Sequence, residues 1–196
     1  IRTLDQLKPE QEQYLDEYFE KEIFPVLTPV AIDELHPFPH LPALMFNLAV
    51  LLESSKEKNE EPCFAIVQVP GRLPGLCRLP DRGTLELCWL NDAVRRRLSS
   101  LFGGYRVLEF AGFRLTRDSE LDIEDEGAYD YVGRLKSELK KRQRAKPIRL
   151  EHEAMSPELL RRIQKALGVG ENELFPAQGP LDPRPLLNIV DTPGYD

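Results

Sequence analysis

The sequence has few of the residue types from which catalytic, metal and membrane-spanning sites are built. Its 196 residues include only three histidines, three cysteines and one tryptophan. An odd number of cysteines (Cys63, Cys77 and Cys88) without metal-ligand spacing is typical of buried or half-buried thiols in a reducing cytoplasm. No apolar run approaches the roughly 20 residues that a membrane-spanning helix needs. We therefore expect a cytoplasmic protein without a transmembrane segment.

The amino terminus lacks two further features. The segment Ile1–Asp5 has neither an initiating methionine nor the basic-then-apolar layout of a secretory signal. We interpret the chain as a fragment or a processed piece of a longer protein. Its apolar content of 41% and charged content of 30% fit a globular domain.

Common nucleotide-binding and hydrolase motifs are absent as well. The sequence contains no Gly-x-x-x-x-Gly-Lys phosphate loop, no Gly-x-Gly-x-x-Gly and no Gly-x-Ser-x-Gly. His36 and His40 lie in or beside a proline-rich segment, where the prolines prevent a helix and no partner has triad-like placement. His152 stands between two glutamates on a predicted strand. We therefore assign no catalytic residue and no metal ligand.

Acidic residues outnumber basic ones, 33 to 26, which gives a net charge of −7. This balance argues against indiscriminate binding to nucleic acid, and we expect no nucleic-acid partner. Carboxylates cluster over 118–130, and cations that include Lys140 and Lys141 follow along the second half of a helix predicted over 127–144. The helix dipole explains this order, at about 0.3–1 kcal/mol per charge. The alternative is a functional cationic end that meets a polyanion or an acidic partner surface.

Helix and strand signals that lack a regular βαβ rhythm predict an α+β fold. We expect a mixed, largely antiparallel sheet with packed helices in a single compact domain over 1–180, followed by a boundary or linker over 181–196. Apolar spacing, together with start and stop signals, favours helices over 8–22, 91–101, 127–144 and 156–167, and strands over 44–52, 63–69, 76–80, 85–89, 105–116 and 147–152.

Four prolines fall within the fifteen residues from Pro25 to Pro39. Each proline fixes its own φ, removes a backbone donor and pushes the preceding residue toward extended geometry. We expect a stiff, apolar, extended connector here, neither a helix nor an ordinary surface loop.

Two arginines at the end of one predicted strand are candidates for a binding role. Arg114 and Thr116 share a strand face, and Arg117 lies at or just past the strand end. A guanidinium in this position can donate two parallel hydrogen bonds to a phosphate. It can equally form ion pairs with the acidic loop that follows. The sequence is compatible with both roles.

Several blocks of the sequence resemble the signature of a known family, in that family's order and at fitting separations. The blocks are Tyr18-Phe19, Ile23–Asp33, His36–Pro39, Asn47–Val50, Phe113–Asp122 and Lys146–Glu151. Together they resemble the middle (head) domain of bacterial polyphosphate kinase, the type that works through a phosphohistidine.

The resemblance implies a parent enzyme that reversibly transfers the γ-phosphoryl group of ATP to polyphosphate. It implies that ATP and Mg²⁺ serve the full-length enzyme, with no cofactor expected in this fragment, and that the enzyme is cytoplasmic or peripheral at the inner membrane. The fragment is expected to support assembly as a homodimer or higher homo-oligomer and to be inactive alone. None of the three histidines matches the phosphate-accepting position.

The resemblance also gives the basic residues a candidate role. A polyanion as dense in charge as polyphosphate needs cationic walls. Arg114, Arg117, Lys140 and Lys141 are therefore candidates for contact with polyphosphate or with a second subunit.

Two other hypotheses belong to different functional classes. One is a stand-alone anion-binding or protein-interaction module that uses the same fold. The other is an independent enzyme, which has only the isolated imidazoles of His36 and His152 in its favour.

Overall fold

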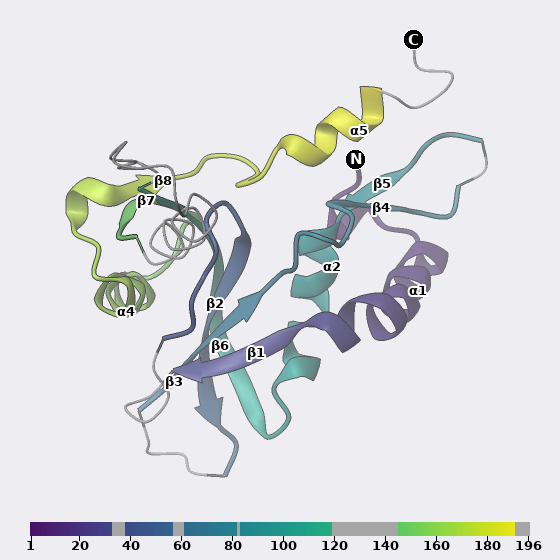
Figure 1. Ribbon diagram of the computed structural model, residues 1–196. Coiled ribbons are helices and arrows are strands. Elements are labelled where there is room, and N and C mark those ends of the chain that lie inside the picture. The colour runs from purple at the N-terminus through teal and green to yellow at the C-terminus, as the bar shows by residue number, and fades with distance from the viewer. Residues whose placement is uncertain (33–37, 57–60, 82, 119–144, 191–196) are drawn as a thin grey trace, which may run out of the picture.

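A computed structural model describes residues 1–32, 38–56, 61–81, 83–118 and 145–190, and shows an α+β fold built on one six-stranded sheet (Figure 1). The strand order is β1-β3-β2-β6-β7-β8, and every neighbouring pair is antiparallel except β7 and β8. The predicted fold class is confirmed. The strands of this sheet are β1 (Thr28–Ile32), β2 (Phe46–Ser54), β3 (Cys63–Gln68), β6 (Tyr105–Arg117), β7 (Pro147–His152) and β8 (Leu174–Pro176).

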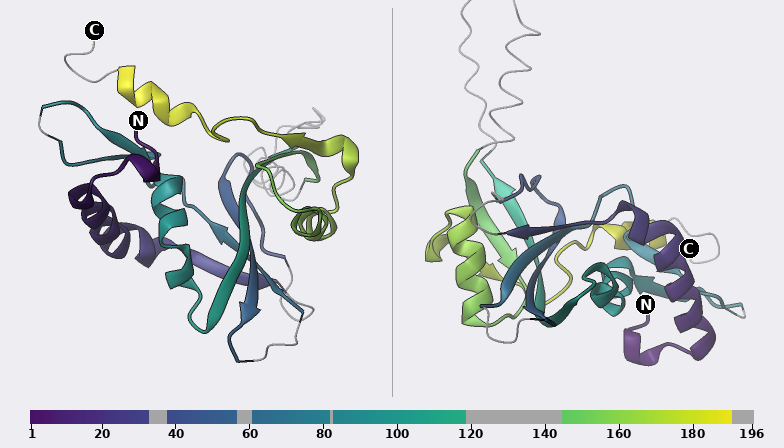
Figure 2. Two further views of the ribbon diagram at one scale, coloured as in Figure 1. Left: turned by 180° about the vertical axis from the view of Figure 1, so that it is seen from behind. Right: turned by 90° about the horizontal axis from the view of Figure 1, so that it is seen from below.

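Helices cover the sheet on both faces (Figure 2). The first face carries α1 (Pro9–Tyr18) with the π-helical turn that follows it, and α2 (Leu90–Arg96). The second face carries α4 (Pro157–Leu167). The central strand β2 contributes side chains to the apolar clusters on both faces of the sheet, because successive side chains of a strand point to opposite faces. Leu48 and Val50 join the first apolar cluster, whereas Ala49 and Leu51 join the second.

The helix on the first face follows the predicted apolar spacing. Leu15, Phe19 and Ile23 recur every fourth residue and are buried in the first cluster. The α-helix ends at Tyr18 and continues as a π-helical turn over Phe19–Ile23. The predicted helix over 8–22 is therefore confirmed, with a wider final turn.

Helix α4 begins and ends as its sequence predicts. Ser156 precedes Pro157 and its Oγ accepts a hydrogen bond from Leu159 N (3.2 Å), which satisfies one of the free amides at the helix start. Gly168 follows the helix at φ 66°, the left-handed conformation that glycine adopts without strain.

The proline-rich connector contains an edge strand, which the sequence did not reveal. Strand β1 pairs with β3 along its whole length. Val69 N donates to Phe46 O (3.1 Å), so alternate residues of β3 face β2 and the others face β1. In this register Thr28 and Val30 face β3, and Pro29 faces away from the sheet. The proline therefore removes no ladder bond and leaves fewer donors on the open edge.

Two short strands, β4 (Leu76–Arg78) and β5 (Leu87–Trp89), form a separate two-stranded sheet that precedes α2. The chain ends in an arm, by which we mean residues 177–190; it contains the turn Arg184–Leu186 and α5 (Leu187–Val190). Leu181 of this arm is buried in the first apolar cluster. The predicted helix over 127–144 lies outside the described residues. Across the described part of the chain, the structure contains no helix of a length and apolarity that could cross a bilayer.

Candidate functional site

Arg114 joins the sheet to the arm. It lies opposite Glu151 in the β6–β7 ladder, and its Nε and Nη2 atoms donate to Glu151 Oε2 at 2.8 and 2.6 Å. Its Nη1 lies 3.9 Å from Asp182 Oδ1 of the arm. The Arg114 side chain is only 15% exposed. This geometry places a half-buried cation between a carboxylate of the sheet and a carboxylate of the arm.

Asp182 is held by its own neighbour. Arg184 donates to it from Nε (2.7 Å) and Nη2 (2.6 Å), and these bonds keep the pKa of Asp182 below its ordinary value. Arg184 Nη2 also donates to Leu44 O (3.4 Å), two residues before β2. Leu44 has φ 62°, a left-handed conformation that is rare for leucine. These charged groups thus fasten the arm to the body at Arg114 and at Leu44.

Arg149 lies on the same face of the sheet as Arg114 and Glu151, and the sequence analysis assigned it no role of its own. We call these three residues, together with Asp182 and Arg184 of the arm, the charged face. Arg149 lies opposite Thr116 in the ladder, and its Nη2 is 3.2 Å from Glu151 Oε1. Its guanidinium carbon stands 3.9 Å above the centre of the Phe175 ring, a cation–π contact. Phe175 belongs to β8, so this contact depends on the parallel pairing of β7 and β8, for which the sequence carries no local signal.

Arg117 contacts backbone rather than side chains. Its Nε donates to Leu41 O (3.1 Å) and its Nη1 to Ala145 O (2.6 Å), and burial lowers the pKa of Arg117. These bonds tie the end of β6 to segments before β2 and before β7. Arg114 and Arg117 therefore lie on neighbouring parts of one strand but engage different partners. Lys140 and Lys141 lie outside the described residues.

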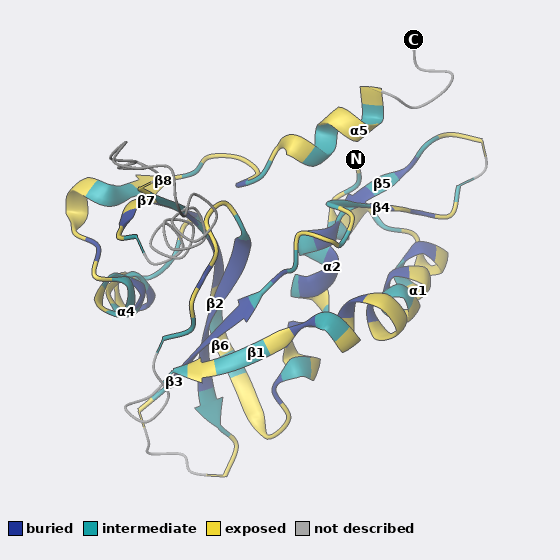
Figure 3. Ribbon diagram, in the orientation of Figure 1, coloured by how far each residue is buried: buried dark blue, intermediate teal, exposed yellow. Residues whose placement is uncertain are grey.

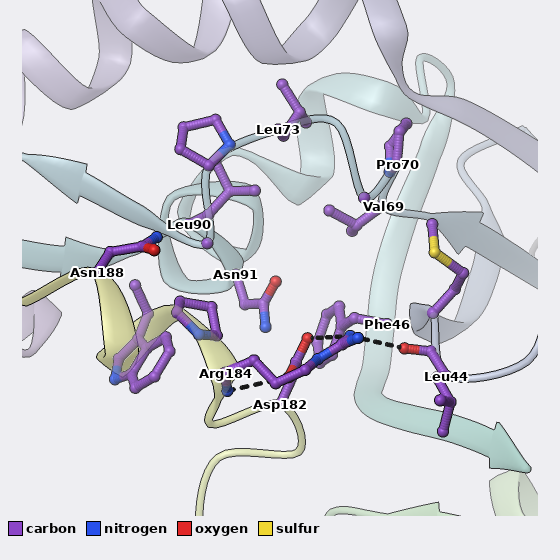
Figure 4. A pocket seen from close by; sticks show the side chains of 16 residues that line it. Leu44, Phe46, Val69, Pro70, Leu73, Leu90, Asn91, Asp182, Arg184 and Asn188 are labelled. Carbon is purple, nitrogen blue, oxygen red and sulfur yellow. Dashed lines mark hydrogen bonds and ion pairs between the residues drawn. The ribbon is translucent and has the colours of Figure 1, made fainter.

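A cleft of about 430 Å³ opens beside this charged face, between the arm and the body (Figure 4). Asp182 and Arg184 line it from the arm, and the Asn91 side chain points into it from the start of α2. The arm approaches the body closely here, because a Cβ on Gly75 would lie only 2.0 Å from Pro185 Cγ. The remaining wall is mostly apolar: Leu44, Met45, Phe46, Val69, Pro70, Gly71, Leu73, Pro74, Trp89, Leu90 and Asn188.

A half-buried ion pair between Arg95 and Glu153 joins α2 to the end of β7. Glu153 accepts from Gly112 N (2.7 Å) and from Arg95, which also donates to Asp92 (3.0 Å). The Arg95 guanidinium lies over the Phe46 ring. Burial raises the pKa of Asp92, although Arg95 acts in the opposite direction. Arg95 therefore fixes α2 to the strand ends.

Arg96, the last residue of α2, pairs with α1, and Arg97 just after it pairs with the π-helical turn that follows α1. Arg96 Nε donates to Asp16 (3.1 Å), and Arg97 Nη2 donates to Glu20 (2.6 Å). The partners lie about 80 residues away along the chain, so sequence spacing gave no sign of these pairs.

The described residues do not fit a magnesium site. Mg²⁺ prefers carboxylate oxygens and water in an octahedral arrangement. The carboxylates of the charged face and of the Arg95 pair, Glu151, Asp182 and Glu153, already accept bonds from arginines. His152 is buried, and its Nδ1 lies 2.8 Å from Glu153 O. Within the described ranges no group of three or more His, Cys, Asp or Glu side chains is placed to hold a metal ion. His36 lies outside those ranges.

The fold and this site define a class: an α+β domain whose charged groups join a sheet to a carboxy-terminal arm. Comparison with known proteins identifies the family. A family model described as "Polyphosphate kinase middle domain" matches residues 10–189, and the chain belongs to this family. The resemblance drawn from the sequence is therefore confirmed.

Individual relatives agree with this assignment. The chain is 39% identical to a polyphosphate kinase of Aphanizomenon baltica over 96% of the chain and 51% of that protein. It is 38% identical to that of Halalkalibacterium halodurans over 92% of the chain and 26% of that protein. The chain thus spans about half the length of the first relative and a quarter of the second.

A solved structure shares the fold. The crystal structure of polyphosphate kinase from Porphyromonas gingivalis matches 90% of this chain and 24% of that one, with a TM-score of 0.70 at 24% identity.

Proposed function

We propose that this chain is the assembly domain of an enzyme that reversibly transfers the γ-phosphoryl group of ATP to polyphosphate through a phosphohistidine. The domain alone is inactive, and the residues that hold ATP and Mg²⁺ belong to other parts of the longer protein. Membership in the polyphosphate kinase family supports the parent reaction.

The observation that carries an assembly role is the bond network of the charged face. Arg114 reaches both Glu151 of the sheet and Asp182 of the arm, and Arg184 reaches the backbone of Leu44. These side chains orient one segment of the chain against another. Such a network suits a domain that positions its neighbours, because an arm held at several points transmits its orientation to whatever follows it.

The domain also supports dimerisation and contributes cations to a polyphosphate path. Arg149 and Arg184 are the more exposed arginines of the charged face, with side chains 44% and 60% exposed. Together with Arg114, Arg117, Lys140 and Lys141, they are the residues from which a contact with a polyanion or a second subunit would be built.

The first test compares the full-length enzyme with this chain alone. Both are incubated with ATP and Mg²⁺, and polyphosphate is measured. We expect synthesis by the full-length enzyme only. Net synthesis by the isolated chain would refute the proposal, and a full-length protein without this activity would refute the parent reaction.

The second test concerns Arg117. Charge reversal, Arg117→Glu, in the full-length enzyme should weaken polyphosphate affinity or dimer stability, measured by binding titration and by sedimentation. Arg106→Glu, on the exposed first half of the same strand, is the matched control. A thermal melt identifies loss of folding, because Arg117 also binds two backbone carbonyls. Unchanged values in a folded variant would remove Arg117 from the proposal.

A further inference from the structure

Two of the three cysteines face each other across the small sheet. Cys77 of β4 is directly opposite Cys88 of β5 in the antiparallel register. Directly opposed residues of such a pair place their side chains on the same face. Both side chains belong to the first apolar cluster, with Cys77 4% and Cys88 0% exposed. Both are free thiols.

The hydrogen bonds of the ladder set the distance between them. Leu79 N donates to Glu86 O (2.9 Å), and Leu90 N donates to Gly75 O (3.0 Å). Hydrogen-bonded pairs recur at every second residue of an antiparallel ladder, and the cysteine pair lies two residues from each of these bonds. Cys77 and Cys88 are therefore a hydrogen-bonded pair, with Cα atoms about 5.5 Å apart. Disulfides span Cα separations of about 4.4–6.8 Å.

The same geometry makes the bond easy to break. Opposed Cβ atoms lie about 4.5–5.5 Å apart, toward the longer end for a hydrogen-bonded pair. A disulfide holds its Cβ atoms about 3.5–4.5 Å apart. Closing the bond therefore draws the two strands together and strains them. Strained disulfides have more oxidising potentials and are readily reduced.

We propose that Cys77 and Cys88 form a reversible redox-modification site, oxidised by a peroxide or by a small disulfide to an intramolecular disulfide. With hydrogen peroxide, one thiolate attacks the O–O bond and becomes a sulfenic acid with release of hydroxide. The second thiol then attacks that sulfur and expels water. In total, two thiols and one peroxide give one disulfide and two waters. A small disulfide accepts the same two electrons and two protons and leaves as two thiols.

Access to the pair requires local opening of the small sheet. Burial raises the pKa of Cys77 to about 12 and that of Cys88 to about 11, so thiolate is scarce while the sheet is closed. The sheet has only three residue pairs, and two-stranded sheets are marginally stable. We therefore expect slow oxidation, at a rate set by the opening of β4 and β5.

Formation of the Cys77–Cys88 disulfide would affect one wall of the cleft. Gly75 and Leu90 lie at one end of the small sheet, and a Cβ on Gly75 would lie only 2.0 Å from Pro185 Cγ of the arm. A disulfide two residues from Gly75 and from Leu90 would hold β4 and β5 together. It would thereby fix the part of the cleft wall against which the arm packs. This inference does not depend on the proposed kinase activity.

The test uses the full-length protein under native conditions. It is oxidised with hydrogen peroxide or glutathione disulfide, then unfolded and alkylated, and the peptides are identified by mass. Trypsin cleavage after Arg78 separates the two cysteines, so a cross-linked peptide pair reports the bond. We expect Cys77 and Cys88 to escape alkylation together and dithiothreitol to restore both.

Cys63 provides the matched control. It lies on β3 opposite Leu52, with no cysteine across from it, and is half-buried. Cys63→Ser should leave the cross-link intact, whereas Cys77→Ser and Cys88→Ser should abolish it. Complete alkylation of Cys77 and Cys88 after oxidation would overturn the proposal, and so would pairing of either one with Cys63 or with another chain. The wild-type and Cys63→Ser results decide the matter even if a Cys77 or Cys88 variant does not fold.

Discussion

The two halves of the six-stranded sheet are stabilised by different chemistry. Around β2 and β3, apolar side chains are buried on both faces. Around β6 and β7, the face under α4 is apolar, and the opposite face carries Arg114, Glu151 and Arg149. Figure 3 shows the contrast between the buried β2 and the exposed first half of β6. Non-directional burial holds the first half, whereas specific pairs of charges orient the second.

The largest effect is expected in the apolar half. Phe19→Ala removes a ring that is 0% exposed in the first cluster, and should cost about 3–5 kcal/mol because the cavity cannot fully collapse. Urea unfolding measures the loss. Tyr14→Ala, an exposed aromatic on the same helix, is the control and should change stability by about 0.5 kcal/mol or less. Equal losses of unfolding free energy in the Phe19 and Tyr14 variants would contradict the assignment of Phe19 to the buried core.

A smaller effect is expected in the charged half. Arg114→Ala leaves Glu151 without its main donor in a half-buried site, and should cost about 1–3 kcal/mol. The control is Arg106→Ala, which breaks the exposed pair with Glu53 and should cost about 0–1 kcal/mol. Urea unfolding compares the two variants. A double variant of Arg114 and Glu151 that loses the full sum of the single losses would exclude coupling between them.

A backbone change should release the arm with little effect on the sheet. Gly75→Ala places a Cβ against Pro185, and the arm can relieve the clash by moving away at a cost of about 1 kcal/mol. The single tryptophan, Trp89, lines the cleft, so its fluorescence should report the change. Gly103→Ala, where a Cβ meets nothing within 4 Å, serves as the control. Identical spectra for both variants would contradict this account of the arm.

The smallest effect is a pH dependence of the same contact. Arg184 lowers the folded-state pKa of Asp182, so the unfolded state binds a proton first as the pH falls. The stabilisation is complete above the unfolded value of about 3.9 and is lost as the pH falls through the lower folded value. Trp89 fluorescence against pH should show a transition that Asp182→Asn removes. A transition that persists in this variant would assign it to another group.

Local signals predicted most helices and strands of both halves, but not the partners of the charged side chains. The spacing of Leu15, Phe19 and Ile23 and the start of α4 at Ser156 involve residues close in the chain, and the structure confirms both. Strand β1 was missed, because Pro29 argues against a strand unless its edge position is known. The roles of Arg114 and Arg117 in binding polyphosphate or a second subunit stay predictions.

Fold class and family could be read from the sequence alone, because apolar periodicity, helix caps and ordered signature blocks are local properties. The sequence also marked Arg114 and Arg117 as candidates. Their partners, the cleft beneath the arm and the opposition of Cys77 and Cys88 became visible in the folded chain. Strand order and register bring distant residues together, and neither can be inferred from the spacing of residues along one chain.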